Sequence, residues 1–168
     1  AFAEKARAEL EEIEFSEERI SEYNRNLEAA KKVLKEKALK LSSTREKAAR
    51  VIEDGVNSQL AFLEMKNAAF SCDITFTEPS ENGVDRVEFL ISPNKGDPMR
   101  PLSRFASGGE LSRIMLAIKN VLADADEIGT MIFDEIDTGI GGATAQAVGE
   151  RLSRLSKKPP LCVSLTFP

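Results

Sequence analysis

Two short runs hold the residues of this chain that could do chemistry: SGGELSR at 107–113 and MIFDEIDTG at 131–139. The first places a serine and two glycines before an apolar face with helical spacing. The second is an apolar strand that ends in adjacent carboxylates, Asp134 and Glu135. Helix N-termini bind phosphates and carboxylates hold Mg²⁺, so both runs suit a nucleotide-hydrolysing site. A GxxxxGK[ST] phosphate loop is absent from all 168 residues, so only part of such a site is present.

The serine–glycine run predicts the start of a helix. Ser107 as N-cap with Glu110 three residues later forms a capping box, and a well-started helix is the simplest interpretation. Gly108 and Gly109 would weaken that helix by roughly 1 kcal/mol each relative to alanine. We therefore expect another group to approach the bare N–H donors closely, and a phosphate is the natural ligand there. The Ser107 hydroxyl would be a further donor.

The carboxylates of the second run fit hydrolysis when they follow this helix. Asp134 could hold Mg²⁺ directly or through water, and Glu135 could orient and deprotonate the attacking water. An apolar strand ending in Asp-Glu is common by chance, and an ordinary acidic strand end is the alternative. Its position one helix after SGGELSR favours the functional interpretation. Asp137 is either a turn residue or a contact to a neighbouring subunit, and the residues leave both open.

The elements that must position these residues follow from periodicity. Alternating apolar residues predict a hairpin, and the later part of the chain alternates helices with strands. Such alternation predicts an α/β fold whose sheet is parallel in its later part. Cys72 and Cys162 fall in expected buried strands and should be reduced core cysteines. The expected elements are strands 70–77 and 85–92, helix 109–123, strand 129–134, helix 143–156 and strand 160–166.

Residues 1 to about 64 predict one long helix. Apolar residues fill the d position of six successive heptads, and no Gly or Pro precedes Gly55. The a positions are poorer, so the seam suits an antiparallel partner helix or packing on one side only. A solvated amphipathic helix in a bundle is the alternative. The d positions are Ile13, Ile20, Leu27, Leu34, Leu41 and Ala48.

Composition excludes several classes of protein. The chain has no histidine, which excludes a serine triad and most catalytic zinc sites within it. No apolar run approaches the ~20 residues of a membrane helix. The net charge of −5 gives no overall case for nucleic-acid binding. Residues 1–22 carry a net −5 and residues 23–50 a net +6. The basic stretch could meet DNA phosphates, but charge alone favours a solvated coiled-coil face.

At these motifs the chain resembles the C-terminal half of an ABC-type ATPase head. SGGELSR is similar to the ABC signature motif, MIFDE to the Walker B strand and IDTG to the D-loop. The flanking sequence, VEFLISPNKGDPMRPLSRFASGGELSRIMLAIKNVL, resembles the RecN family of bacterial SMC-like DNA double-strand break repair proteins. The resemblance implies a descending coiled-coil arm at 1–64. It also implies the C-terminal lobe of the head at 65–168, a mixed sheet with flanking helices.

In that family two heads sandwich ATP, and this implies a role for each motif residue. Asp134 would be the carboxylate on the Mg²⁺ side and Glu135 the catalytic general base. The signature would contact the γ-phosphate held by the other head, and the D-loop would reach across the dimer. The residues implied to bind ATP are Ser107, Gly108, Gly109, Glu110 and Asp137.

Two departures from the family limit these expectations. Walker A is missing, so we expect ATP and Mg²⁺ to bind productively only together with the N-terminal half of the protein. Leu165 stands where the family has its switch histidine. The implied partners are that N-terminal half, a second head, and DNA ends or single strands. The resemblance also implies a cytoplasmic protein that acts at the nucleoid and does not bind a membrane. A non-catalytic coiled-coil module that pairs with another polypeptide is the alternative. A third possibility is the nucleotide-binding half of a transporter, but the expected coiled-coil arm does not suit that class of protein.

Overall fold

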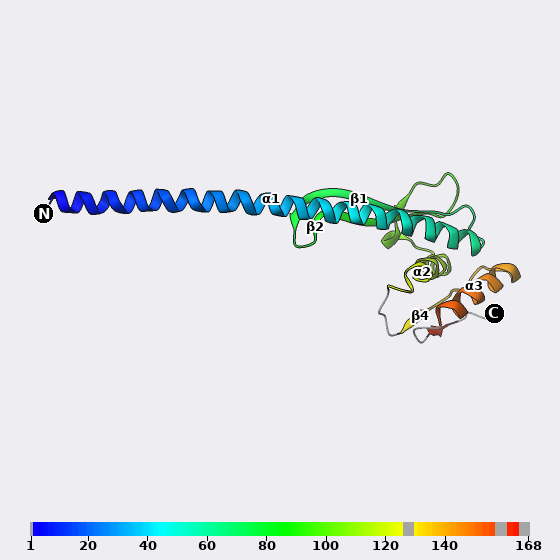
Figure 1. Cartoon of the computed structure of the whole chain (residues 1–168). Coiled ribbons are helices and arrows are strands. Elements are labelled where there is room, and N and C mark those ends of the chain that lie inside the picture. Colours follow the sequence, from blue (N-terminus) through cyan, green and yellow to red (C-terminus); the bar gives the residue numbers. More distant parts are fainter. Residues whose placement is uncertain (1, 126–129, 157–160, 165–168) are drawn as a thin grey trace. The chain divides into compact units, whose positions relative to one another are not determined.

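The computed structural model describes residues 2–125, 130–156 and 161–164 (Figure 1). The expected order of elements is confirmed, with most boundaries within a few residues of those expected. Residues 129, 160, 165 and 166 of the expected strands lie outside the described residues, and so does the Leu165 position. The elements are α1 Phe2–Phe62, β1 Ala69–Ser80, β2 Gly83–Ser92, β3 Arg100–Pro101, the short 3-10 helix Leu102–Arg104, α2 Gly108–Leu122, β4 Met131–Phe133, α3 Gly142–Leu155 and β5 Leu161–Val163.

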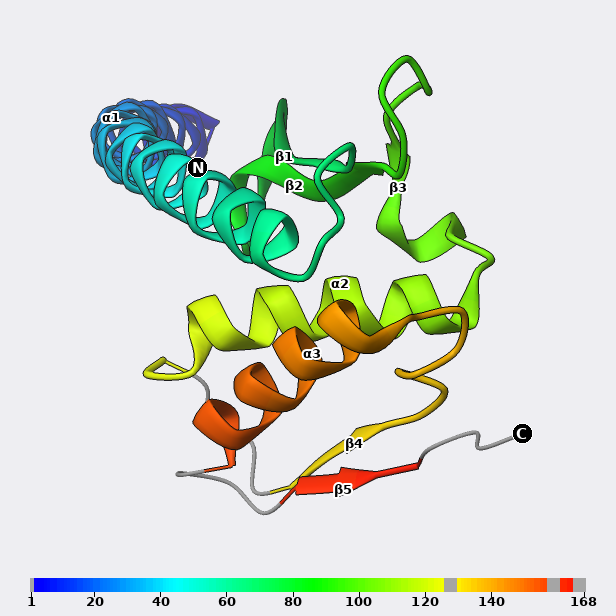
Figure 2. The same cartoon turned by 90° about the vertical axis from the view of Figure 1, so that its right-hand side faces the viewer.

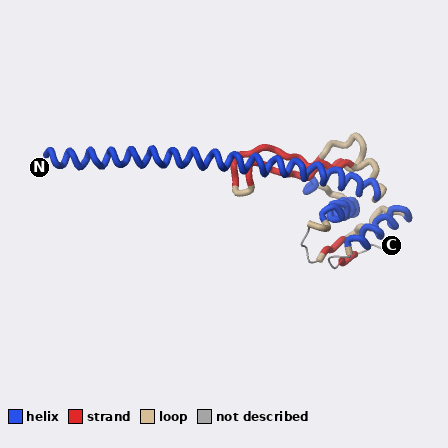
Figure 3. Tube along the Cα trace, in the orientation of Figure 1, coloured by secondary structure: helices blue, strands red, loops and turns tan. Residues whose placement is uncertain are grey.

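The chain divides into two compact units. One comprises residues 1–44 and 78–84, and the other comprises residues 45–77 and 85–168. Strands occur between α1 and α2 and on either side of α3 (Figure 3). None of the helices described has a stretch that is long and apolar enough to cross a bilayer.

The core of the second unit is built around α2. Ile114 and Leu116 of this helix are fully buried, together with Leu60 of α1, Leu63 just after it and Ile91 of β2. Figure 2 shows α2 between the end of α1 with β1–β3 on one side and α3 with β4 and β5 on the other. Helix α2 is thus packed on both sides in the second unit.

Helix α1 approaches α2 closely because it carries a glycine where the two helices meet. A Cβ at Gly55 would lie 3.1 Å from both methyl carbons of Val121. Contacts this short are tighter than ordinary van der Waals packing, so a larger residue at this position would push the helices apart.

Side chains of α1 also pair with β1, which is an edge strand of the sheet ordered β1-β2-β3. The Asn57 side-chain amide donates to the Phe70 carbonyl at 2.9 Å, and the Phe70 N–H donates to Asn57 Oδ1 at 2.8 Å. The Cys72 N–H donates to Glu53 Oε1 at 2.6 Å. An exposed strand edge invites pairing with other chains, and α1 occupies this one.

The later strands form the expected parallel pair. Met131, Ile132 and Phe133 of β4 lie beside Leu161, Cys162 and Val163 of β5, respectively. Met131 and Phe133 are buried, whereas Ile132 is 74% exposed. Cys162 is also exposed, so the expectation of a buried core cysteine there was wrong; Cys72 is half-buried. Adjacent residues of paired strands point to the same face, so Ile132 and Cys162 mark a bare face of the sheet.

Candidate functional site

The two sequence runs meet where the start of α2 packs against the loop that follows β4. The Ser112 hydroxyl donates to the Asp134 carbonyl at 2.6 Å. Arg113 Nη1 donates to the carbonyl oxygens of Ile136 at 3.3 Å and Thr138 at 3.0 Å. The two runs are therefore in direct contact within the chain, and their expected contributions to two different nucleotides stay a prediction.

The two glycines of the first run have different neighbours in this region. A Cβ at Gly109, which is buried, would lie 3.0 Å from the Glu135 carbonyl oxygen and 3.0 Å from Thr138 Cβ and its carbonyl oxygen. A Cβ at the exposed Gly108 would collide with the Glu135 carboxylate. Packing within the chain is thus sufficient to explain a glycine at position 109, independently of any bound phosphate.

Helix α2 starts as expected, but its capping box does not form. Ser107 is the N-cap with an extended backbone, and its carbonyl accepts a hydrogen bond from the Leu111 N–H at 2.9 Å. Its side chain makes no capping hydrogen bond to the described part of the helix. Ser107 is exposed at the N-terminus of α2, beside the first N–H groups of the helix. An approaching oxyanion would meet these donors and the positive end of the helix dipole.

Asp134 and Glu135 are both exposed at the carboxyl end of β4, the edge where α/β sheets bind ligands. The Glu135 N–H donates to Asp134 Oδ1 at 3.0 Å. Glu135 has a φ of 54°, a left-handed conformation that is uncommon for a residue with a side chain. Such backbone strain persists only where the surroundings hold it, and it often marks functional sites.

The donor set suits Mg²⁺ bound together with a phosphate. No cluster of three or more Cys, Asp and Glu side chains able to hold a metal occurs among the residues with described positions. Mg²⁺ usually takes one or two carboxylates and completes its shell with water and substrate phosphates. The exposed pair at Asp134 and Glu135 fits that pattern, with the phosphate supplied from elsewhere.

A tight turn follows the carboxylates. The Thr138 N–H donates to the Glu135 carbonyl at 3.0 Å, and the Ile140 N–H donates to the Asp137 carbonyl at 3.4 Å. Gly139 has a φ of 73°, which explains a glycine at that position. Asp137 thus has the turn role that the sequence allowed, and its contact to a neighbouring subunit stays a prediction.

Arg113 is the residue of this region that sequence reasoning missed. Only 7% of it is exposed, and burial lowers the pKa of its guanidinium, an effect that the nearby Glu110 carboxylate partly offsets. A signal was available: Arg113 lies four residues after Gly109 and four before Ala117, both of which are buried. A charge on the buried face of a helix requires partners, and here these are the loop carbonyls.

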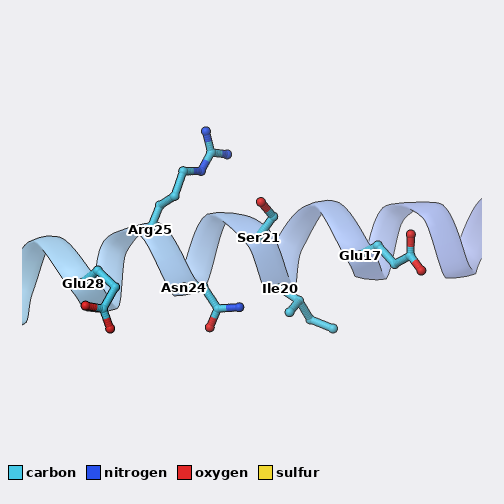
Figure 4. Close-up of a pocket in the computed structure, with 6 residues that line it drawn as sticks. All are labelled: Glu17, Ile20, Ser21, Asn24, Arg25 and Glu28. Atoms are coloured by element: carbon cyan, nitrogen blue, oxygen red, sulfur yellow. The ribbon is translucent and has the colours of Figure 1, made fainter.

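In the other unit, the surface of α1 carries apolar residues at heptad spacing. A shallow depression is lined by Glu17, Ile20, Ser21, Asn24, Arg25 and Glu28 (Figure 4). Ile20 and Asn24, at d and a positions, point to one side of the helix, and Arg25 points to the other. The d residues Ile20, Leu27, Leu34 and Leu41 are all exposed. Exposed apolar side chains seven residues apart are typical of a coiled-coil seam.

Comparison with known proteins finds relatives over almost the whole chain, although no family model matches it. The DNA repair protein RecN of Halalkalibacterium halodurans is 35% identical across 97% of the chain, and that of Bacillus subtilis is 33% identical across 92%. RecN of Treponema pallidum is 63% identical over 83 residues, 49% of the chain and 14% of that protein. The chain spans about 30% of the length of the first two relatives.

Solved structures with a similar fold are SMC head domains. A head with an extended coiled coil from Pyrococcus furiosus, bound to the C-terminal domain of ScpA, aligns with a TM-score of 0.53 at 20% identity. The alignment covers 84% of this chain and 33% of the Pyrococcus furiosus head chain. A head with a coiled coil and joint from Pyrococcus yayanosii aligns with a TM-score of 0.52, and the alignment covers 77% of this chain and 24% of the Pyrococcus yayanosii chain. At this level of identity the similarity concerns the fold alone.

Proposed function

This chain belongs to the RecN family, where it matches the C-terminal region, and we propose that it forms one lobe of a DNA-repair ATPase head. The other lobe, with the phosphate loop, would come from the N-terminal half of the same protein. ATP would then be hydrolysed between two such heads. The proposal implies a cytoplasmic protein that acts at the nucleoid.

The observation that carries the proposal is the bare face of the β4–β5 pair. Parallel strands are normally covered on both faces. Here Met131 and Phe133 face the core, while Ile132 and its neighbour Cys162 are exposed. An α/β head with one face of its parallel sheet uncovered is missing a layer, and an N-terminal lobe would supply it.

Two apolar grooves along α2 support the same partner. Leu111 and Met115 line both of them, so the grooves are neighbours on one side of the helix. One groove extends toward β2 and the other toward β4. Their further apolar lining residues are Val87, Phe89 and Leu102 in the first and Met131, Ile132 and Phe133 in the second. A second lobe could bury this surface and the bare sheet face together.

The proposed chemistry assigns a role to each exposed polar group. Glu135 takes a proton from water as the water oxygen bonds to the γ-phosphorus and the bond to ADP breaks. Asp134 holds the Mg²⁺ that neutralises charge on the phosphate oxygens. At the start of α2, the Ser107 hydroxyl and the N–H groups of Gly108 and Gly109 receive the γ-phosphate bound to a neighbouring head. Glu110 and Asp137 would complete the contact across the dimer.

The exposed heptad seam of α1 supports a coiled-coil arm, whose partner would be an antiparallel helix of the N-terminal half. DNA ends or single strands would be the substrate of the assembled protein. The same exposed seam favours a second candidate function, a non-catalytic module that pairs with another polypeptide through it. The two candidates differ in whether the reconstituted head hydrolyses ATP.

Reconstitution tests the proposal. The chain is co-expressed with the N-terminal half that carries GxxxxGK[ST], and Mg-ATP hydrolysis by the purified complex is measured. Glu135→Gln should lower kcat by at least about 100-fold, because it removes the proton acceptor, and the complex should remain intact. Glu81→Gln, which neutralises an exposed carboxylate in the β1–β2 turn, is the matched control and should hydrolyse ATP normally. A stable, folded complex without hydrolysis would favour the interaction module instead.

A further inference from the structure

We propose that Arg113, with Ser112 beside it, is a positioning residue for ATP hydrolysis that holds the Asp134–Thr138 loop and thereby sets the place of Glu135. The proposal rests on the proposed function, since that is where Glu135 acts as general base. Arg113 touches neither carboxylate, so it acts through the loop backbone.

The contacts form a regular pattern. Three carbonyls at alternate positions of the loop accept hydrogen bonds from two consecutive residues of α2. Ser112 donates to Asp134, and Arg113 donates to Ile136 and Thr138. The donors come from a helix that is packed on both sides. The loop is thus tied at three carbonyls to a helix whose apolar face lies in the core.

Burial of the guanidinium indicates that these bonds matter. Desolvation of a charge is costly, and it is the main reason why the pKa of Arg113 is lowered. The position lies on the buried face of α2, where an apolar side chain would fill the space without that cost. The two carbonyls that Nη1 bonds offset part of this cost, whereas the buried Nε–H has no partner among the described residues.

The tied carbonyls lie on either side of Glu135. The Thr138 N–H closes the turn onto the Glu135 carbonyl, and Glu135 itself is in the left-handed region. Without external bonds a residue with a side chain would relax from that conformation. Ser112 and Arg113 supply such bonds immediately before and after it. Release of the loop would therefore displace the Glu135 carboxylate.

The arrangement links two nucleotides. In the proposed head dimer, Ser107 to Gly109 serve the ATP of the neighbouring head, whereas Asp134 and Glu135 serve the ATP of their own. Arg113 is on the same helix as the first group and bonds the loop that bears the second. A shift of α2 on binding the neighbour's phosphate would thus move the catalytic carboxylate.

Two measurements test the proposal. In the reconstituted complex, Arg113→Met should lower kcat at least tenfold and change KM less than twofold, because the residue does not touch nucleotide. Arg113→Lys keeps a charged donor and should recover kcat to within about threefold of the unmodified protein. Arg154→Met removes an exposed cation in the last turn of α3 and should leave both constants unchanged. In the chain alone, Arg113→Met should speed amide hydrogen exchange at Thr138 and Ile140 about tenfold, and Leu111 should not change.

The exchange measurement separates this proposal from the proposed function, because it needs no ATPase activity. Unchanged exchange at Thr138 would overturn the inference, whether or not the complex hydrolyses ATP. Faster exchange throughout α2 in Arg113→Met would show a merely structural role and would also overturn the inference. The same holds if kcat is as low in Arg113→Lys as in Arg113→Met. If Arg113→Met does not fold, Ser112→Ala decides: it should speed exchange at the loop amides without affecting Leu111.

Discussion

At the residue scale, Gly108 and Gly109 should respond differently to the same substitution. Gly109→Ala places its methyl 3.0 Å from backbone and Cβ atoms of Glu135 and Thr138, which cannot move without shifting the loop. We expect it to lower the free energy of unfolding by about 1–3 kcal/mol. Gly108→Ala meets only the end of the Glu135 side chain, which can rotate away, and should cost less than about 1 kcal/mol. Urea denaturation of both variants measures the difference.

The pair also separates folding from nucleotide contact. In the reconstituted complex, Gly108→Val should leave the fold nearly intact but abolish ATP-dependent pairing of heads, since its side chain obstructs the mouth of α2. If pairing survives, the signature does not receive a phosphate at Gly108. If the two alanine variants are equally stable, the close packing of Gly109 on the loop is wrong.

At the scale of elements, the Asn57 side chain makes two of the hydrogen bonds that attach α1 to β1, beside the one that Glu53 accepts from Cys72. Asn57→Ala removes both hydrogen bonds to Phe70 and leaves the N–H and carbonyl of that residue without their partner. Loss of partners for buried backbone groups should lower the free energy of unfolding by about 1–3 kcal/mol. Asn67→Ala, at an exposed residue of the segment after α1, is the control and should change stability by less than about 0.5 kcal/mol. Equal effects would contradict the attachment.

Elements were predictable from the sequence where a local pattern determines them, and contacts between elements were not. The apolar face of 109–123 and the alternation in 85–92 predicted α2 and β2 to within two residues at each end. The spacing of apolar residues along the chain indicates which face of an element is buried. No such pattern records that Asn57 pairs with Phe70 or that Arg113 bonds the loop after β4. The error at Cys162 has a related cause: an apolar strand predicts burial on both faces only when every covering layer belongs to the same chain.

At the scale of the whole molecule, the reactivity of the two cysteines tests whether a second lobe covers the bare face of β4 and β5. Burial, and then the charge of Glu53, raise the pKa of the Cys72 thiol to about 11, so at pH 8 very little of it is the reactive thiolate. Cys162 is exposed beside Ile132 on the bare sheet face. A thiolate-selective reagent at pH 8 should therefore label Cys162 roughly tenfold or more faster than Cys72 in the chain alone, and Cys72 should catch up as the pH approaches 11.

Binding of the N-terminal half should reduce this difference. If that half covers the face that carries Ile132 and Cys162, labelling of Cys162 should slow at least tenfold in the complex, while Cys72, attached to the base of the arm, should keep its rate. Mass spectrometry of the labelled peptides before and after mixing measures both rates in one sample. A complex that hydrolyses ATP with Cys162 still fully reactive would mean that the second lobe packs elsewhere. The bare β4–β5 face would then need another cover, because an uncovered parallel pair with an exposed isoleucine is itself a site for association.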